Sequence, residues 1–306
     1  MQISVVWTIN ARTASADRAV EHLAEIAEEG FRRVWCTQMP NEPDALTMLT
    51  VAGWEVPEIE FGTSVLPMQV QHPMLLAQRA LTTNAVIGPR LHLGLGLSHQ
   101  VVTEGMWGVS YKRPVQRTNE YLDGLLPLLN SEKVSAAGEL ITTRGSLTLR
   151  DVPATPVYLA ALGPKMLGIA GSRTSGTVTW MTGPKTLRDH IVPNLRAAAV
   201  GAGREESAVR TVAMLPVAVT DDVVGARAAA GEQFAMYDNL PSYKAMLDRE
   251  GFTGPADAAI IGDEASVAEQ ITTLGSYGVD EFVGILFDRD PEVRARTRAL
   301  LRTLDE

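Results

Sequence analysis

The stretch IEFGTSVLPMQVQHPMLLAQRALTTNAVIGPRLHLGLGL, residues 59–97, decides the fold. It opens with an apolar run at 59–66, continues with a helical pattern from Pro73 to Ile87, and closes with a second apolar run at 90–97. Proline suits the first turn of a helix, and apolar runs bounded by Gly and Pro are typical of buried strands. The stretch therefore predicts a strand, a helix and a second, parallel strand, a unit of roughly 30 residues.

The same alternation runs along the whole chain. Helical patterns at 14–29, 43–54 and 115–129 separate further apolar runs. The apolar runs lie at 3–7, 33–37, 59–66, 90–97, 156–162, 177–181, 209–219 and 281–287. Such strands, separated by helices, are typical of a parallel sheet with a covered outer face, either open or closed into a barrel. Eight units in 306 residues, slightly above the roughly 250 usual for the closed form, favour an α/β fold of the (β/α)8 TIM-barrel type.

The residues in excess of eight plain units gather in two places. Segments 131–155 and 238–262 hold most of the additional Gly, Pro and polar residues, so we expect short insertions there. Gly138, Gly145 and the alternating SLTLRDV at 146–152 predict a short hairpin in the first segment. Because neither segment has the character of an interdomain linker, we expect a single domain over all 306 residues.

Composition excludes several classes of partner. The 36 acidic residues outnumber the 27 basic ones and give a net charge of −9, and no basic stripe is present, so a nucleic-acid partner is not expected. No stretch reaches the roughly 18 uninterrupted apolar residues of a membrane helix, and the N-terminal residues do not resemble a signal peptide. We therefore expect a cytoplasmic protein without a membrane partner. The one cysteine, Cys36, lies in an apolar run and is interpreted as a small buried hydrophobe.

In a barrel of this type the active site is formed by the loops after the carboxyl ends of the strands. The residues that directly follow the first five expected strands are Thr8, Asn10, Thr37, Gln38, Met39, Ser64 to Met68, Ser98, His99, Gln100, Gly163, Pro164 and Lys165. They include no pair of carboxylates, no cluster at metal-ligand spacing, no GxSxG motif and no Walker loop, so no metal is expected. This absence indicates that an organic cofactor carries the reaction while the barrel binds and orients it.

The segment AALGPKMLGIAG, residues 160–171, is the best local signal for an anion. Gly163 lets a ligand approach the backbone, Pro164 begins a helix whose first amides face outward, and Lys165 adds a positive charge. Gly-Pro is also an ordinary way to begin a helix, so a purely structural role stays open. The run GLGLS at 94–98 lacks the third glycine of a dinucleotide-binding fingerprint and is not interpreted as one.

Five motifs in order resemble the luciferase-like oxidoreductases, over nearly the whole chain. They are EFGTSVLPMQVQHPMLLAQRALT at 60–82, GPRLHLGLGLSHQ at 88–100, KRPVQRTNEYLDGLLPLLN at 112–130, PVYLAALGPKMLGIAG at 156–171 and AAIIGDEASVAEQI at 258–271. Within that superfamily the chain is most similar to the branch that uses coenzyme F420, a 5-deazaflavin, although members that use FMN share most of these motifs. The resemblance also implies a homodimer.

The resemblance implies a cofactor site residue by residue. In relatives the turn after the third strand contains a non-prolyl cis peptide behind the cofactor ring, which places it here between Ser64 and Val65, and an ordinary trans strand end is the alternative. Residues after the glycine pair line the pocket near the ring, and the GPK segment binds the cofactor phosphate. The cofactor-binding residues are thus Thr37, Ser64, Val65, Ser98, His99, Ala161, Gly163, Pro164 and Lys165.

Two departures from the superfamily restrict the reaction. Sugar-phosphate dehydrogenases of this kind carry an Asp-His pair after the second strand and a glutamate after the glycines, whereas this chain has Gln38 and Met39, then His99. His99 is the candidate catalytic residue because its ordinary pKa suits the proton transfer that accompanies hydride transfer. Contact with cofactor or substrate, or a structural role, is the alternative. Of the other histidines, His72 is expected to cap a helix, while His22, His92 and His190 are interpreted as structural.

The resulting hypothesis is hydride transfer between a reduced deazaflavin and a C=C, C=N or C=O bond of a small organic substrate. A deazaflavin lacks the ring nitrogen that makes reduced flavin reactive toward oxygen. The alternative is therefore an FMN-dependent monooxygenase, and a third reading is a flavin-binding storage or sensory protein. Substrate identity is not encoded. Some residues could line an apolar pocket or belong to the core, namely Trp7, Met39, Met68, Trp107 and Trp180.

Overall fold

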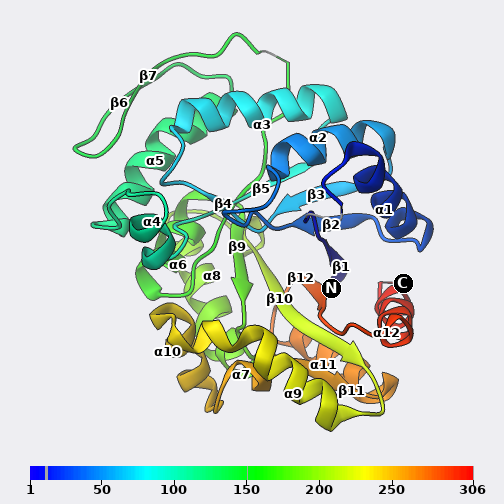
Figure 1. Ribbon diagram of the computed structural model, residues 1–306. Coiled ribbons are helices and arrows are strands. Elements are labelled where there is room, and N and C mark those ends of the chain that lie inside the picture. Colours follow the sequence, from blue (N-terminus) through cyan, green and yellow to red (C-terminus); the bar gives the residue numbers. More distant parts are fainter. Residues whose placement is uncertain (11–12, 150, 306) are drawn as a thin grey trace. The chain divides into compact units, whose positions relative to one another are not determined.

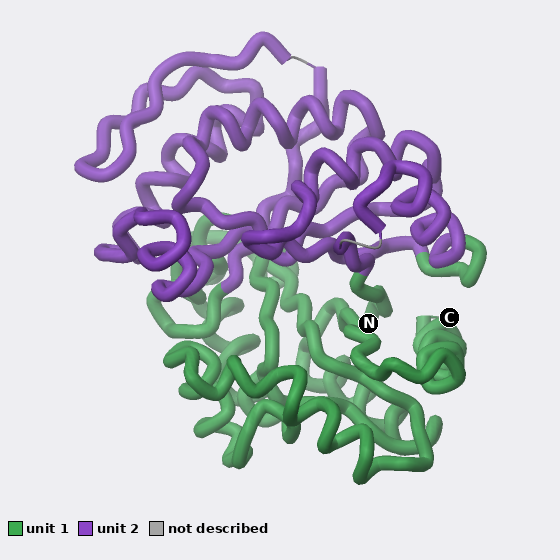
Figure 2. The backbone as a smooth tube through the Cα atoms, in the orientation of Figure 1, with its two compact units in different colours: residues 1–6, 28–31, 161–306 green, residues 7–27, 32–160 purple. Residues whose placement is uncertain are grey.

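A computed structural model describes residues 1–10, 13–149 and 151–305. The chain divides into two compact units, which Figure 2 shows in green and purple. Unit 1 holds residues 1–6, 28–31 and 161–306, and unit 2 holds residues 7–27 and 32–160.

Unit 2 is built on four parallel strands in the order β2, β3, β5, β8. Their bounds are Arg33–Cys36, Glu60–Thr63, Leu91–Gly96 and Val157–Leu159, and the two-residue strand β4, Leu66–Pro67, also pairs with β5. The helices are α1 (Ala16–Glu28), α2 (Ala45–Glu55), α3 (Pro73–Ile87), α4 (Gln100–Gly105) and α5 (Pro114–Leu129). An antiparallel hairpin, β6 (Val134–Ala137) and β7 (Thr142–Gly145), follows α5 (Figure 1).

Unit 1 has its own parallel sheet, in which β12 lies between β1 and β10, and β10 also pairs with β9 and β11. The strands are β1 (Gln2–Trp7), β9 (Gly176–Trp180), β10 (Arg210–Val219), β11 (Ile260–Gly262) and β12 (Glu281–Leu286). The main helices are α6 (Pro164–Arg173), α8 (Val192–Gly201), α9 (Val223–Phe234), α10 (Pro241–Glu250), α11 (Glu264–Ser276) and α12 (Pro291–Thr303). Short turns complete the unit, namely α7 (Pro184–Thr186), the π-helix η1 (Leu187–Ile191), and the 3-10 helices η2 (Glu206–Ala208), η3 (Ala235–Asn239) and η4 (Pro255–Ala258).

The expected fold class is confirmed. The parallel strands β1, β2, β3, β5, β8, β9, β10 and β12 alternate with helices along the chain, which gives the (β/α)8 barrel. Several local expectations differ from the structure. The expected strand 59–66 is interrupted between β3 and β4, and the described residues of SLTLRDV form no strand, because the hairpin is made by the residues before them. The short helix α4 and the strand β11 were not expected.

The segments expected as insertions contain regular structure. Segment 131–155 holds the hairpin, and segment 238–262 holds α10, η4 and β11. The single domain and the insertions stay predictions. Across the described ranges no helix combines the length and the apolar character needed to cross a bilayer, and location in the cytoplasm stays a prediction.

Large aromatic side chains fill the core of unit 2. Trp7 and Trp35 are fully buried, with Trp7 6.1 Å from the Phe61 ring and Trp35 edge-on to Tyr158 at 5.8 Å. Gly62 on β3 makes room for Trp35, since a Cβ there would lie 2.2 Å from an indole carbon. Close packing of this kind leaves little freedom to the strands that present the loops of the site.

A charged cluster lies at the amino end of β3. The buried Arg33 donates to Glu60, with Nε 2.9 Å from Oε2, and His92 Nε2 lies 3.2 Å from the same oxygen. The hydrogen bond with His92, together with that from Arg33, lowers the pKa of Glu60 from 4.5 to about 2. The ionised carboxylate is thus favoured in the folded chain.

We predict that this cluster contributes stability that is present above pH 4.5 and is lost as the pH falls toward about 2, because the unfolded chain binds the Glu60 proton in that window. Glu60→Gln should therefore flatten the fall of the free energy of unfolding over this range. Urea unfolding at several pH values measures it, with the exposed Glu55→Gln as control. Equal slopes for the wild type and Glu60→Gln would contradict the prediction.

Candidate functional site

The peptide bond between Ser64 and Val65 is cis, as the resemblance implied. It joins β3 to β4 at the carboxyl end of β3. The Ser64 amide donates to the Cys36 carbonyl oxygen at 2.8 Å, so the turn also continues the pairing of β2 with β3. Thr37, the residue after β2, therefore lies beside this turn in the sheet.

Two glycines of β5 allow the turn to lie against that strand. A Cβ at Gly94 would lie 1.8 Å from the Thr63 carbonyl oxygen, and a Cβ at Gly96 would lie 2.5 Å from Val65 Cγ2. The Thr63 hydroxyl fixes the approach, because it donates to the Gly94 carbonyl oxygen and accepts from the Gly94 amide, each at 2.9 Å. The glycine pair thus has a structural reason of its own, independent of any dinucleotide.

Two serines next to these strands have unusual environments. Ser64 Oγ is buried and has no hydrogen-bond partner within the described part of the chain. Ser98, after β5, has φ of 54°, in the left-handed region that non-glycine residues seldom adopt. A buried hydroxyl group without a partner is costly, and strained backbone gathers at ligand sites. Both features fit a bound ligand with polar atoms at this edge of unit 2.

His99 is the N-cap residue of α4, and its backbone is firmly held. Its carbonyl oxygen accepts from the Thr103 amide at 2.8 Å and from the Thr103 hydroxyl at 2.9 Å. The imidazole is half-buried, and burial lowers the pKa of His99 below its ordinary 6.5. At neutral pH the ring is therefore uncharged and can both donate and accept one hydrogen bond.

A cavity of about 300 Å³ opens in unit 2 at the carboxyl ends of β2 and β4. Gln38, Met39 and Trp107 all line it, and the Gln38 side chain accepts a hydrogen bond of 2.8 Å from the Ala45 amide at the start of α2. The full lining is Gln38, Met39, Pro40, Asp44, Leu66, Pro67, Val70, Gln71, Leu75, Arg79 and Trp107. Met39 and Trp107 thus belong to a cavity wall, whereas Trp7 and Met68 are core residues with 0% and 1% exposure.

In unit 1, α6 begins as expected at Pro164, with Gly163 as its N-cap residue. No side chain caps this helix start, and a Cβ at Gly163 would meet no atom within 4 Å. Ala161 is buried and fixed, since its amide and carbonyl groups bond to Thr177 Oγ1 at 3.3 and 3.1 Å. Lys165 is exposed. Nothing within unit 1 requires glycine at 163, and the space before the helix is open to an anion.

The sequence repeats GPK at 183–185, where the structure shows the opposite situation. The carboxylate of Glu250, from the end of α10, accepts from the Lys185 amide at 2.8 Å and from the amide and hydroxyl of Thr186 at 2.7 Å. A Cβ at Gly183 would lie 2.5 Å from Glu250 Cδ. The chain itself therefore shows that a Gly-Pro-Lys helix start can hold an oxyanion. The repeat is visible in the sequence and was missed, whereas nothing in the sequence identifies Glu250 as its partner.

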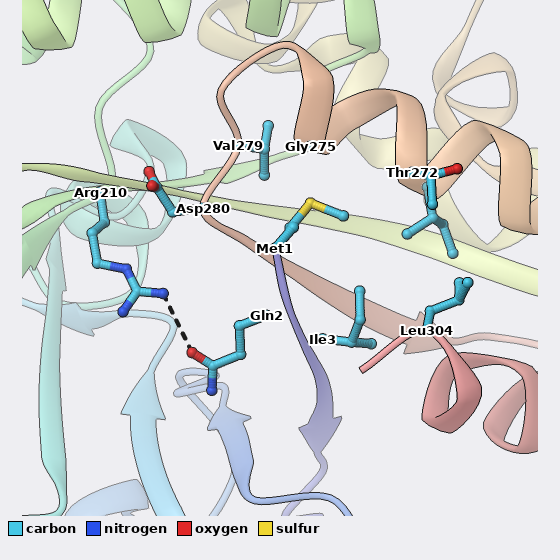
Figure 3. A pocket seen from close by; sticks show the side chains of 10 residues that line it. Met1, Gln2, Ile3, Arg210, Thr272, Gly275, Val279, Asp280 and Leu304 are labelled. Atoms are coloured by element: carbon cyan, nitrogen blue, oxygen red, sulfur yellow. Dashed lines mark hydrogen bonds between the residues drawn. The ribbon is translucent and has the colours of Figure 1, made fainter. Parts of the chain in front are cut away.

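A second cavity, of about 520 Å³, lies at the amino ends of β1 and β10 in unit 1 (Figure 3). Arg210 points toward Gln2, with its guanidinium 3.3 Å from Gln2 Oε1, and lies 3.9 Å from the buried carboxylate of Glu281. Ser4 Oγ donates to the same carboxylate at 2.7 Å. These contacts hold strand ends together, and they lie opposite the strand ends that carry the candidate site residues.

The remaining residues singled out in the sequence have structural partners. His72 caps α3 by accepting from the Met74 amide, and His190 bonds through Nε2 to the Leu162 carbonyl oxygen at 2.8 Å. Cys36 is fully buried, and burial, followed by the charges of Glu42 and Asp44, raises the pKa of its thiol. Over the described ranges no group of His, Cys, Asp and Glu could hold a metal ion.

The structure therefore gathers the candidate residues into two groups. Thr37, Ser64, Val65, Ser98 and His99 follow the strands of unit 2, and Ala161, Gly163, Pro164 and Lys165 form one segment at the start of α6 in unit 1. Each group follows carboxyl ends of parallel strands, where barrels of this type carry their active sites. Binding of a cofactor by these residues stays a prediction.

The chain is similar to known proteins over most of its length. Residues 1–281 match the luciferase-like monooxygenase family. A 5,10-methylenetetrahydromethanopterin reductase of Methanolobus tindarius is 30% identical over 265 residues, which are 86% of this chain and 80% of that protein. The coenzyme F420 dependent tetrahydromethanopterin reductase of Methanopyrus kandleri has a TM-score of 0.79 at 19% identity, covering 100% of this chain and 97% of the other. The oxygenating constituent of 3,6-diketocamphane monooxygenase of Pseudomonas putida, solved with FMN, has a TM-score of 0.76 at 16% identity over 99% and 97%.

The chain belongs to the luciferase-like monooxygenase family and is an oxidoreductase. The resemblance drawn from the sequence is thereby confirmed.

We predict that Gly96→Ala destabilises the protein by about 1–3 kcal/mol, since the added methyl group must displace Val65 or the turn that carries it. Thermal and urea unfolding measure the loss. Gly168→Ala is the control, because a Cβ there meets nothing within 4 Å and a helix interior gains up to about 1 kcal/mol from alanine. A Gly96→Ala variant as stable as the wild type would show that β5 does not constrain the turn.

Proposed function

We propose that this enzyme binds coenzyme F420 and transfers a hydride between its deazaflavin and a C=C, C=N or C=O bond of a small organic substrate. The observation that carries the proposal is the open helix start at Gly163–Lys165. The second copy of the same motif, at 183–185, holds a carboxylate. The names of the relatives support the choice of cofactor, since the Methanolobus protein is a 5,10-methylenetetrahydromethanopterin reductase and the Methanopyrus protein is a coenzyme F420 dependent tetrahydromethanopterin reductase.

The residues present fit such a cofactor. The first amides of α6 and the Lys165 ammonium would hold its phosphate, with the helix dipole adding to the attraction. The Ser64–Val65 turn would support the ring, and the unpartnered Ser64 hydroxyl would bond to one of its polar atoms. Of the other residues expected to bind the cofactor, Thr37 and Ser98 lie in unit 2 and Ala161 lies in unit 1. When bound, the deazaflavin supplies or accepts the hydride.

His99 would hold the proton that accompanies the hydride. Its backbone is held at the start of α4, which places the ring at the carboxyl end of β5. In the direction of reduction the protonated ring gives its proton to the atom next to the carbon that takes the hydride. In the direction of oxidation the neutral ring takes that proton.

The same scaffold supports a second candidate, an FMN-dependent monooxygenase. The phosphate of FMN would suit the same helix start, and the diketocamphane oxygenase with bound FMN shares the fold. In that case the substrate would be oxygenated and the Gly163–Lys165 assignment would be unchanged.

The homodimer expected from the resemblance stays a prediction. Its support is one face of α2, where Trp54 is 66% exposed and Val51, three residues earlier, is 40% exposed. Apolar and aromatic residues without charges are typical of interface cores. A second copy of this acidic chain would be repelled least at such a face.

Gly163→Ala tests the helix start without disturbing its packing. The free energy of unfolding should change by no more than about 1 kcal/mol, because the gain from a less flexible unfolded chain is offset by alanine being a poorer N-cap than glycine, and the Cβ meets no atom. The Kd for F420 should rise, since the methyl group takes space that the phosphate needs. Lys165→Ala should raise the Kd roughly tenfold to a hundredfold, the loss of one charge-assisted contact, with kcat unchanged.

Lys185→Ala is the matched control, since the carboxylate of Glu250 already fills its helix start. Fluorescence titration with F420 gives the Kd of each variant. Unchanged affinity with collapsed turnover in Lys165→Ala would assign that residue to the substrate. The choice of cofactor is tested by titrating the wild type with F420 and FMN, then assaying the reduced cofactor with and without oxygen against imines, enones and ketones. Submicromolar FMN binding with oxygen-dependent product would promote the monooxygenase.

We further predict the pH dependence of reduction. The pKa of His99 lies below 6.5, so the ring loses its proton as the pH rises through that lowered value. The kcat/KM for reduction should therefore fall over the same range. His99→Gln should remove this limb of the profile and leave the Kd for F420 within a few-fold. An unchanged profile in His99→Gln would show that another group, or solvent, provides the proton.

A further inference from the structure

Five aromatic rings form a connected cluster in unit 1. Trp180, the last residue of β9, lies 5.6 Å from both Phe234 and Tyr237, with the rings close to perpendicular. Tyr237 continues to Tyr243 at 5.0 Å, and Phe234 continues to Phe287, just after β12, at 5.8 Å. The cluster therefore joins the carboxyl ends of β9 and β12 to the segment 235–250, which comprises η3 and α10.

Segment 235–250 is fixed at both of its ends. Near the start, Tyr237 and Tyr243 pack edge to face with each other and, through Tyr237, with Trp180. At the end, Glu250 accepts three hydrogen bonds from Lys185 and Thr186, at the beginning of the helical run that follows β9. Strand β9 thus holds the segment twice, through its last residue and through the turn after it.

The glycine before this turn indicates how close the fit is. A Cβ at Gly183 would lie 2.5 Å from Glu250 Cδ and 2.7 Å from Cγ, so only glycine lets the carboxylate reach the amides. At the corresponding Gly163 a Cβ would meet nothing within 4 Å. The carboxylate of Glu250 is therefore a built contact of the fold, in contrast to the open site for the cofactor phosphate.

The cluster is not entirely enclosed. Phe234 and Phe287 are buried, whereas Trp180 and Tyr237 are half-buried and the neighbouring Met236 is 51% exposed. Rings at right angles present faces and edges that suit another flat apolar group, and small-molecule sites are lined mainly by such side chains. The cluster also lies at carboxyl ends of barrel strands, where substrates of this fold are bound.

We propose that Trp180 and Tyr237 form an aromatic wall that takes the flat, conjugated part of the substrate, and that Glu250 is a positioning residue that holds segment 235–250 so that this wall is complete. The inference rests on the proposed function for the reaction, and it adds the substrate class. Without the carboxylate contact, the remaining hydrogen bond between α10 and the turn after β9 is the one from the Thr186 hydroxyl to the Met246 carbonyl oxygen at 3.4 Å, so Tyr237 is held less firmly on Trp180.

The test compares 4-phenylbut-3-en-2-one with pent-3-en-2-one, which has a methyl group in place of the phenyl ring. In Glu250→Gln the KM for the phenyl enone should rise about tenfold, which corresponds to about 1.4 kcal/mol. The KM for the methyl enone, the kcat for both and the Kd for F420 should stay unchanged. Gly183→Ala, which disturbs the same contact from the other side, should also raise the KM for the phenyl enone alone. Glu269→Gln changes the charge in the same way at an exposed position and should leave both KM values unchanged.

Binding is also measured without turnover, by the quenching of tryptophan fluorescence on titration with the phenyl enone. Trp180→Phe should remove this quenching, and Glu250→Gln should weaken it about tenfold, with equal thermal stability checked by calorimetry. An equal rise in KM for both enones, or quenching that persists in Trp180→Phe, would contradict the proposed aromatic wall. A wild type that binds the phenyl enone through Trp180 but not F420 would overturn the proposed function and leave this inference standing.

Discussion

No side chain fits at positions 94 and 96 of β5, because the turn that leaves β3 lies directly against that strand. This close approach decides where the rest of unit 2 can go. The chain continues from Val65 into β4, where Leu66 pairs with Leu95, and the Met68 amide then donates to the Gly96 carbonyl oxygen. β5 ends at Gly96, so Ser98 and His99 emerge next to the turn. A larger residue on β5 would shift both the floor of the proposed ring site and His99, which follows this strand.

The two GPK helix starts show how one local motif serves two purposes in a single chain. Both place a glycine before a proline at the first helical position, which leaves amide groups pointing outward. Glu250 satisfies one of these starts from within the fold, so that site is closed to outside anions. The other start has no such partner within the described residues, and it is the one to which we assign the cofactor phosphate. The difference lies in the partner that tertiary structure brings, and the motif alone does not distinguish the two.

The sequence allowed much of the fold to be predicted, because buried parallel strands are continuous apolar runs and helix starts carry Pro, Asp or His. The start of α6 at Pro164 was predicted from a local motif, and the cis bond after Ser64 from the resemblance to the family. Local sequence patterns did not predict the structure where contacts between residues far apart in the sequence determine it. SLTLRDV alternates like a strand, yet the hairpin forms one step earlier, where Glu120 of α5 accepts from the amides of 139–141. Glu250 lies 65 residues from Lys185, and no short-range pattern joins them.

One buried side chain has a practical consequence for future experiments. Cys36 is the chain's one cysteine, it is the fully buried last residue of β2, and its raised pKa keeps the sulfur protonated at neutral pH. Maleimides and other thiol reagents attack thiolates, so the native protein should stay unlabelled. A cysteine introduced at an exposed position would then be the sole attachment point for a spin label or dye. A pair of introduced cysteines would report the distance between two chosen positions in solution, without first removing the natural thiol.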